Sequence, residues 1–143
     1  MHNVELARDY IARAELRLRA VDTLFEEGGW ADVVRESQEV VELALKALLR
    51  GCGVAAPRIH DVSEVMLLER NRLPDFLAPE VDRLAEISKE LRRDLELAFY
   101  GAEDLTPSGF YSRGDAERAR DGATRTVELV RPHVSPAVVA HRH

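Results

Sequence analysis

The sequence predicts an all-α protein, folded as an antiparallel up-and-down bundle of four long helices plus one short helix. Long segments repeat apolar residues at intervals of three and four, which is the period of an amphipathic helix. No segment shows the sustained alternation of apolar and polar residues typical of a half-buried strand. The chain has 143 residues, of which 45% are hydrophobic, so one domain can bury a core without disulfides or metal. We expect this domain over residues 1–131 and a flexible tail over residues 132–143.

The first two helices are predicted to form an antiparallel pair. The first covers residues 4–26, and Gly28-Gly29 then supplies the positive φ that favours a helix end. The second begins directly at Trp30, and so short a connection places the two helices side by side. The apolar and small side chains of the second helix form one stripe, made of Trp30, Val33, Val34, Ser37, Val41, Ala44, Leu45 and Leu48. Its opposite face carries charged residues and is expected to face water.

A short helix is predicted after the loop that follows the second helix. The second helix is expected to end at Gly51-Cys52-Gly53, and the loop covers residues 54–59, which include a proline and show no helical period. Asp61 and Glu64 have the spacing of a capping box, in which the first side chain accepts a hydrogen bond from the amide of the third helical residue. We therefore expect a helix over residues 62–70.

Two more long helices complete the predicted bundle. One covers residues 79–100, because proline is tolerated in a first turn and an apolar stripe follows. That stripe consists of Val81, Leu84, Ser88, Leu91, Leu95 and Ala98. A loop over residues 101–112 separates it from the last helix, at residues 115–130, whose start is marked by Ser112 and Asp115, a second capping signal.

The composition narrows the classes of function. Acidic residues outnumber basic ones by 26 to 20, giving a formal net charge of -6, which argues against an extended nucleic-acid surface. Cys52 is the single cysteine, and no set of cysteines and histidines has zinc spacing, so no metal site is expected. No apolar run approaches the roughly 18 residues of a membrane span, and no signal peptide is apparent. We expect a cytoplasmic protein without membrane contact.

The helical segments carry an ordered set of residues that indicates a family. The most specific part is the run Glu-Leu-Ala-Leu-Lys-Ala-Leu-Leu that begins at Glu42. The full set is Tyr10, Ala14, Trp30, Gln38, Glu42, Leu43, Ala44, Leu45, Lys46, Ala47, Leu48, Gly53, His60 and Val62. With this set the chain resembles HEPN (higher eukaryotes and prokaryotes nucleotide-binding) domains, which are small helical bundles often encoded beside minimal nucleotidyltransferases. The resemblance covers nearly the whole chain.

The resemblance also directs attention to a ribonuclease motif. Many HEPN domains are metal-independent ribonucleases that carry an arginine, four to six intervening residues and a histidine, often with a tyrosine two residues later. The counterpart here is Arg93 with Tyr100, but Ala98 occupies the histidine position, and starting from Arg92 gives the same alanine. Cleavage through the RNA 2′-hydroxyl without a metal needs a group that exchanges protons near neutral pH, and alanine has none. We therefore predict that HEPN-type ribonuclease activity is absent.

The same helix predicts an interface. At about 100° per residue, Arg93, Leu97 and Tyr100 share one face, roughly opposite the apolar stripe. An arginine beside a leucine and a tyrosine on an outer face is typical of an interface anchor. In HEPN proteins the corresponding face lies in a two-fold dimer, so the resemblance implies a homodimer with these residues at its interface.

Four further residues are binding candidates: Gln38, Glu42, Lys46 and His60. Glu42 and Lys46 are four apart, and an exposed ion pair is the favoured interpretation. Gln38 flanks the core stripe and either binds a partner or nucleotide or lies at the core edge without such a role. His60 is either a ligand or proton-transfer residue or, as is more common, a histidine whose ring packs at a helix entrance.

The favoured function is a non-catalytic HEPN binding module that acts with a minimal nucleotidyltransferase, in a toxin-antitoxin or nucleotide-modifying pair. The resemblance implies that Tyr100 is the residue such a transferase could modify. One alternative is an atypical ribonuclease that uses His60, or a group from the other subunit, together with Arg93. Another is simple nucleotide binding, for example of ATP, between the helices. No other cofactor is expected.

Overall fold

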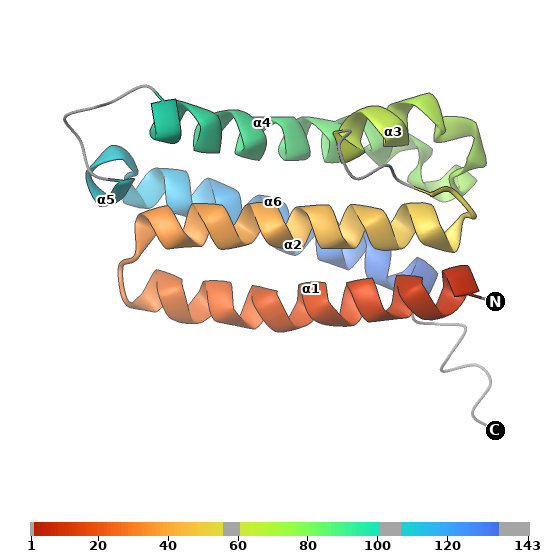
Figure 1. Ribbon diagram of the computed structural model, residues 1–143, viewed down its shortest axis with the longest axis horizontal. Coiled ribbons are helices and arrows are strands. Elements are labelled where there is room, and N and C mark those ends of the chain that lie inside the picture. Colours follow the sequence, from red (N-terminus) through yellow and green to blue (C-terminus); the bar gives the residue numbers. More distant parts are fainter. Residues whose placement is uncertain (1, 56–60, 101–106, 135–143) are drawn as a thin grey trace.

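The computed structural model is a helical bundle, drawn in Figure 1. It describes residues 2–55, 61–100 and 107–134, but not the side chains of residues 2, 3, 94–100, 107 and 108. The four long helices are α1 (His2–Glu26), α2 (Trp30–Gly51), α4 (Val81–Tyr100) and α6 (Arg113–Val134). The short elements are α3 (Val62–Leu68), α5 (Pro107–Phe110) and the 3-10 helices η1 (Arg70–Arg72) and η2 (Asp75–Glu80). No strand occurs in these ranges, and the all-α prediction is confirmed.

Helix α2 is the centre of the bundle. It packs along α1 and α6 and also contacts α4, while α3 lies against α4 (Figure 1). The predicted stripe of α2 is buried from Val33 to Leu48, whereas Trp30 at its start is only partly buried. Val40, Leu43, Ala47 and Leu49 are also buried, although they lie outside the stripe. The prediction of a single core face on α2 was therefore too narrow, because neighbours cover this helix on several sides. Helices α4 and α6 touch each other over only a short stretch.

The connection between α1 and α2 follows the predicted pattern. Gly28 adopts φ +77°, and its N–H donates to the carbonyl of Phe25 at 3.0 Å. The N–H of Gly29 donates to the carbonyl of Leu24, also at 3.0 Å. These bonds satisfy carbonyls at the end of α1 and turn the chain directly into Trp30.

The segment between α3 and α4 differs from the prediction in its boundaries. Asp61 caps α3, but its carboxylate accepts from the N–H of Ser63, the second helical residue, at 2.9 Å. Helix α3 ends at Leu68 rather than at residue 70, and α4 begins at Val81 after the 3-10 helix η2. Leu77 is buried within η2, so packing of this side chain holds a tight helical turn between the two predicted helices.

The last helix is longer than predicted. Ser112 and Asp115 form a reciprocal cap, in which the Ser112 N–H donates to the carboxylate at 2.8 Å and the Asp115 N–H donates to the hydroxyl at 3.2 Å. At the other end α6 continues past Pro132 to Val134, which is buried. Proline in the last turn removes one backbone hydrogen bond, and burial of Val134 favours the extra turn. The predicted tail residues from 135 onward lie outside the described part of the chain.

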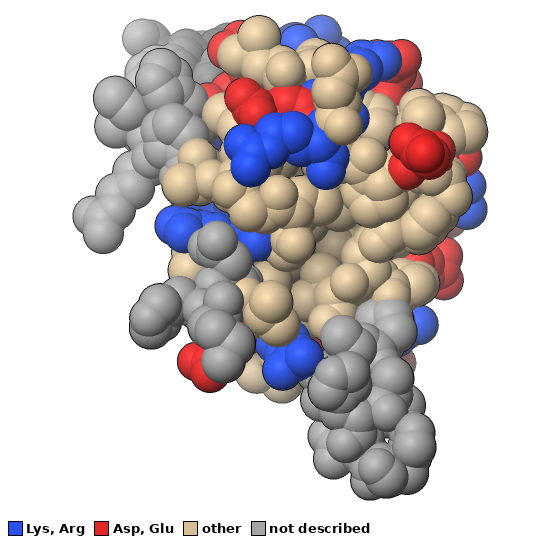
Figure 2. All heavy atoms as spheres, turned by 90° about the vertical axis from the view of Figure 1, so that its right-hand side faces the viewer, with Lys and Arg blue, Asp and Glu red and all other residues tan. Residues whose placement is uncertain are grey.

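The outer surface combines both signs of charge. Figure 2 shows the end of the bundle at the right of Figure 1, where basic and acidic groups lie beside one another among uncharged residues. Ion pairs such as Arg70–Asp82, at 2.6 Å, join several of these groups. Within the described residues, no helix has a stretch long and apolar enough to cross a bilayer.

Candidate functional site

A row of polar side chains runs along α2 on the side that meets α4. Gln38, Glu42 and Lys46 are four residues apart, so they lie one above the other on the helix. The Gln38 amide Nε2 donates to Oε1 of Glu42 at 3.1 Å. The same carboxylate oxygen accepts a hydrogen bond from Nη2 of Arg92, which comes from α4, at 2.8 Å. One oxygen of Glu42 thus joins two helices.

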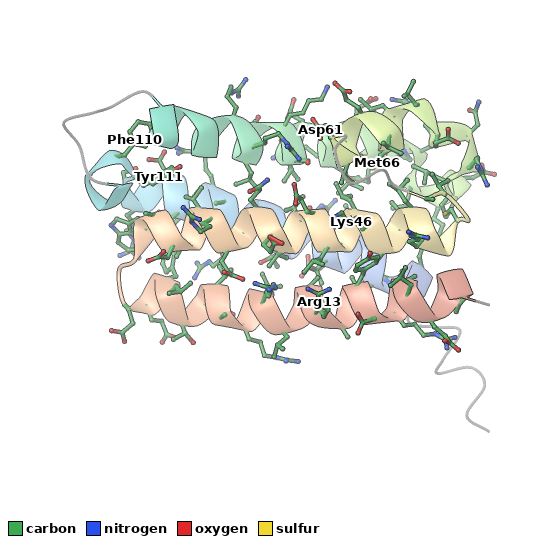
Figure 3. The ribbon with its side chains drawn as sticks, viewed as in Figure 1. Arg13, Lys46, Asp61, Met66, Phe110 and Tyr111 are labelled. Atoms are coloured by element: carbon green, nitrogen blue, oxygen red, sulfur yellow. The ribbon has the colours of Figure 1, made fainter. Side chains whose placement is uncertain are left out.

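Arg92 also approaches the start of α3. Its Nε lies 3.9 Å from Oδ1 of Asp61, too far for a hydrogen bond. Asp61 Oδ1 instead accepts from the backbone N–H and the hydroxyl of Ser63, at 2.9 and 2.8 Å. We call Gln38, Glu42, Lys46, Asp61 and Arg92 the polar cluster; Figure 3 labels Lys46 on α2 and Asp61 before α3. The cluster places two carboxylates around one guanidinium.

The electrostatics of the polar cluster centre on Glu42. Burial raises the pKa of the Glu42 carboxyl above its ordinary value, and Glu39 and Asp61 add to this effect. Arg92 and Lys46 act in the opposite direction but do not outweigh burial. The Arg92 charge is balanced by nearby carboxylates, so this guanidinium is poorly placed to hold an additional anion.

The prediction that Glu42 pairs with Lys46 is wrong. Glu42 pairs with Arg92, and the exposed fraction of its side chain is 22%. Gln38 donates to Glu42, so the polar side chain at the core edge has a partner within the chain. Arg92 was considered only as an alternative start of the ribonuclease motif. Its place four residues after the buried Ser88 indicates that it borders the core stripe, a signal that sequence reasoning could have used.

The predicted interface residues are only partly visible. Arg93 is exposed on α4, as predicted. Positions 97 and 100 belong to the α4 backbone, but the side chains of Leu97 and Tyr100 lie outside the described residues, as does all of His60. The structure therefore does not test the predicted interface at Leu97 and Tyr100 or the predicted role of His60.

The described residues offer little for metal or thiol chemistry. No group of three or more histidine, cysteine, aspartate or glutamate side chains among them could hold a metal ion. Burial raises the pKa of the Cys52 thiol, and Arg72 only partly offsets this. A raised pKa keeps the thiol protonated near neutral pH, the form that is a poor nucleophile.

A family model places the whole arrangement among known proteins. The model described as HEPN domain matches residues 7–133. The chain belongs to the HEPN family. The match runs from α1 to the last turn of α6 and includes every residue of the polar cluster, so the resemblance inferred from the sequence is confirmed. No curated protein and no solved structure gives a significant match to this HEPN chain.

Proposed function

We propose that this HEPN domain is a non-catalytic binding module that forms a homodimer and acts with a minimal nucleotidyltransferase. The family is known for nucleotide binding or ribonuclease activity, and the proposal selects binding. The observation that carries it is Ala98, which stands where the ribonuclease motif requires histidine. Without an imidazole at that position, the motif offers no group to exchange protons with the 2′-hydroxyl at neutral pH.

The arginines of α4 support the same conclusion. Arg92, one of the two that could begin the motif, is hydrogen-bonded to Glu42 at 2.8 Å. Arg93 is exposed on the helix surface. A ribonuclease needs an arginine that is free to stabilise phosphate and a proton-exchanging group beside it. Arg93 alone satisfies the first need, and alanine fails the second.

The described residues contain no histidine that is suited to replace the one missing at position 98. His133 is the one imidazole among their described side chains, and its ring stacks on Phe76 with centroids 4.2 Å apart. Burial lowers the pKa of His133, which disfavours the protonated form that a general acid requires. His133 thus has a packing partner in η2 and a reduced capacity to act as an acid.

A cleavage assay tests the non-catalytic part of the proposal. Single-stranded RNA is incubated with the purified protein in EDTA, beside Arg93→Ala and a matched control, Lys89→Ala, on the same helix. We expect no cleavage above the buffer rate for any of the three proteins. Cleavage by the unmodified protein that disappears in Arg93→Ala and persists in Lys89→Ala would contradict the proposal.

The alternative ribonuclease has one specific observation in its favour. His60 immediately precedes Asp61, whose carboxylate lies 3.9 Å from Nε of Arg92. Position 60 is thus adjacent in sequence to the polar cluster, and its imidazole is the candidate replacement for the missing histidine. If the RNA assay detects cleavage, loss of that activity in His60→Ala would establish this alternative.

A second experiment tests the partner. The protein is mixed with a minimal nucleotidyltransferase, the proposed partner, together with ATP and Mg²⁺, and its intact mass is measured. We expect a stable complex and the mass increase of a transferred nucleotidyl group, absent in Tyr100→Phe. Tyr111→Phe is the control, because Tyr111 is only 6% exposed and is protected from a transferase. If no complex forms, the proposed transferase partner is contradicted. If a complex forms but the mass is unchanged, only the proposed modification of Tyr100 is contradicted.

A further inference from the structure

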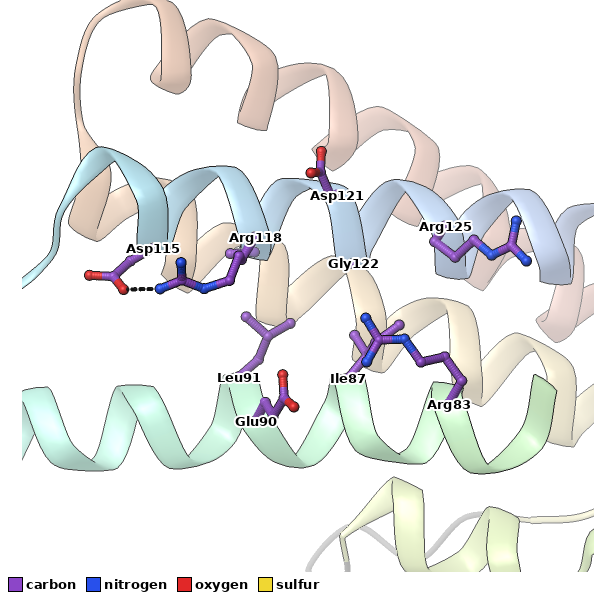
Figure 4. A pocket seen from close by; sticks show the side chains of 10 residues that line it. Arg83, Ile87, Glu90, Leu91, Asp115, Arg118, Asp121, Gly122 and Arg125 are labelled. Atoms are coloured by element: carbon purple, nitrogen blue, oxygen red, sulfur yellow. Dashed lines mark hydrogen bonds and ion pairs between the residues drawn. The ribbon is translucent and has the colours of Figure 1, made fainter.

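Helix α6 carries two sets of arginines that are seven residues apart. Arg118 and Arg125 line a groove of about 440 Å³ between α4 and α6, which Figure 4 shows from close by. Each has a carboxylate partner within the chain: Asp115 pairs with Arg118, and Glu80 pairs with Arg125 at 3.4 Å. These two guanidinium groups are therefore engaged within the fold.

The second set, Arg113 and Arg120, lies on roughly the opposite side of α6. At about 100° per residue, Arg120 is turned about 160° from Arg118 around the helix axis. The Cζ atom of Arg120 lies 3.8 Å from the centre of the Phe25 ring of α1. The Cζ atom of Arg113 lies 5.3 Å from the centre of the same ring and 6.0 Å from that of Trp30 in α2. The two guanidinium groups therefore converge on one aromatic pair.

The aromatic pair orients both guanidinium groups. Phe25 and Trp30 pack edge to face, with ring centroids 5.2 Å apart, and the faces of such rings attract cations. A guanidinium that stacks on a ring uses its flat face and leaves the N–H groups at its edge available to donate. Because the ring already restricts the side chain, less conformational entropy is lost when those N–H groups bind an acceptor.

The donors of Arg113 and Arg120 are unused within the described residues. Neither side chain donates a hydrogen bond to any of these residues, and Arg120 has no ion-pair partner among them. Glu117 approaches Nε of Arg113 only to 4.0 Å, which is too far for a hydrogen bond. The side chain of Arg113 is 67% exposed, and Arg120 is partly exposed. Two oriented positive groups therefore face water without the carboxylate partners that Arg118 and Arg125 have.

This arginine set lies at the end of the bundle where α4 finishes. Figure 1 shows the end of α4, helix α5, the start of α6 and the α1–α2 turn together at the left. Helix α5 contacts both α2 and α4, and α6 follows it directly, beginning at Arg113. Tyr100, the residue proposed for modification, is the last residue of α4. A protein bound over this end of the bundle can therefore contact the arginines and approach Tyr100.

We propose that Arg113 and Arg120 dock an acidic segment of the minimal nucleotidyltransferase, whose carboxylates accept hydrogen bonds from the edges of both guanidinium groups. Guanidinium and carboxylate have matching planar shapes, and these charge-assisted bonds are stronger than neutral ones. An RNA strand fits this chain less well, because a formal net charge of -6 disfavours a long run of phosphates beyond so small a positive site. The inference rests on the proposed function and adds the surface by which the partner binds.

Charge reversal tests this docking surface. Arg113→Glu/Arg120→Glu should raise the dissociation constant of the transferase complex about tenfold or more, measured by isothermal titration calorimetry. Arg113→Gln/Arg120→Gln removes the attraction without adding repulsion and should weaken the complex less. The matched control is Arg118→Glu/Arg125→Glu, which makes the same change in charge at the same spacing on the other side of α6 and should leave the dissociation constant unchanged. Added salt should weaken the unmodified complex more than that of the Arg113→Glu/Arg120→Glu variant, because salt screens attraction between opposite charges.

Circular dichroism and melting temperature establish that each variant is folded, and the glutamine variant decides the test if the glutamate variant does not fold. If the folded variant binds the transferase as tightly as the unmodified protein, or if the control loses binding equally, the docking surface is contradicted and the proposed partner stands. If the unmodified protein forms no complex, the partner and the surface are both contradicted. If Arg113→Glu/Arg120→Glu abolishes binding of labelled single-stranded RNA but not of the transferase, the surface binds RNA and the proposal is wrong.

Discussion

The contact between Arg92 and Glu42 gives the sharpest test of how this bundle uses its charged residues. The perturbations are Arg92→Met, which retains most of the side-chain length, and Glu42→Gln, which retains the shape. Arg92 Nη2 lies 2.8 Å from Glu42 Oε1, and the pair joins α4 to α2 across 50 residues of sequence. We expect the two substitutions to interact energetically, because each removes one half of the same contact.

The exposure of the two side chains sets the size of that interaction. The side chain of Arg92 is 38% exposed and that of Glu42 is 22% exposed. Exposed pairs contribute about 0.2–1 kcal/mol, while removing one partner of a fully buried pair costs about 3–5 kcal/mol. Because water screens Arg92 substantially, we expect a coupling energy of about 1 kcal/mol. The Arg83–Glu86 pair, with side chains 55% and 58% exposed, is the control and should give less than about 0.5 kcal/mol.

The assay is a double-mutant cycle, with free energies of unfolding from urea titrations at pH 7. Titration of Glu42 by NMR provides an independent measurement. Its folded pKa is raised, so the folded protein holds this proton more tightly than the unfolded chain does. The Glu42 contribution to the free energy of unfolding therefore falls as pH rises from the ordinary glutamate value through the folded pKa. Glu42→Gln removes this contribution, and Arg92→Met raises the pKa of Glu42 further.

Two results would refute this reasoning. One is a coupling energy for Arg92 and Glu42 no larger than that of the Arg83–Glu86 control. The other is a Glu42 pKa at or below the ordinary glutamate value in the folded protein, because burial is the first cause of the rise. The first result would mean that water screens the pair more fully than its exposure indicates, and the second would mean that Arg92 and Lys46 outweigh burial at Glu42.

Three further predictions concern stability. Gly28→Ala should lower the free energy of unfolding by about 1 kcal/mol, because φ is +77° there and no atom lies closer than 4.0 Å to the added carbon. Gly29→Ala, at φ -82°, should change it by less than about 0.5 kcal/mol in the same urea titration. Ser112→Ala should cost about 1 kcal/mol through loss of the α6 cap, measured by thermal unfolding. Burial lowers the folded pKa of His133, so stability should fall as pH drops below about 6.5, and His133→Phe, still able to stack on Phe76, should weaken that dependence.

The sequence by itself determined the helices and several of their ends. The stripe that includes Val33, Val41 and Leu48 is set by neighbours three and four residues away, so it can be recognised without knowledge of the fold. The positive φ of Gly28 and the cap between Ser112 and Asp115 depend on contacts within a few residues. The family followed from the same local pattern, and Ala98 was visible at once.

Only the tertiary structure decided which helix faces meet. Glu42 pairs with Arg92 rather than with Lys46, because packing of α4 on α2 brings a guanidinium across from a distant part of the chain. The burial of α2 beyond its predicted stripe has the same origin, since several helices surround it. A groove remains between α4 and α6 because these helices pack chiefly on other helices, and no periodicity within either helix encodes it. Local order reflects contacts between near neighbours in sequence, whereas partners and cavities depend on how whole elements dock.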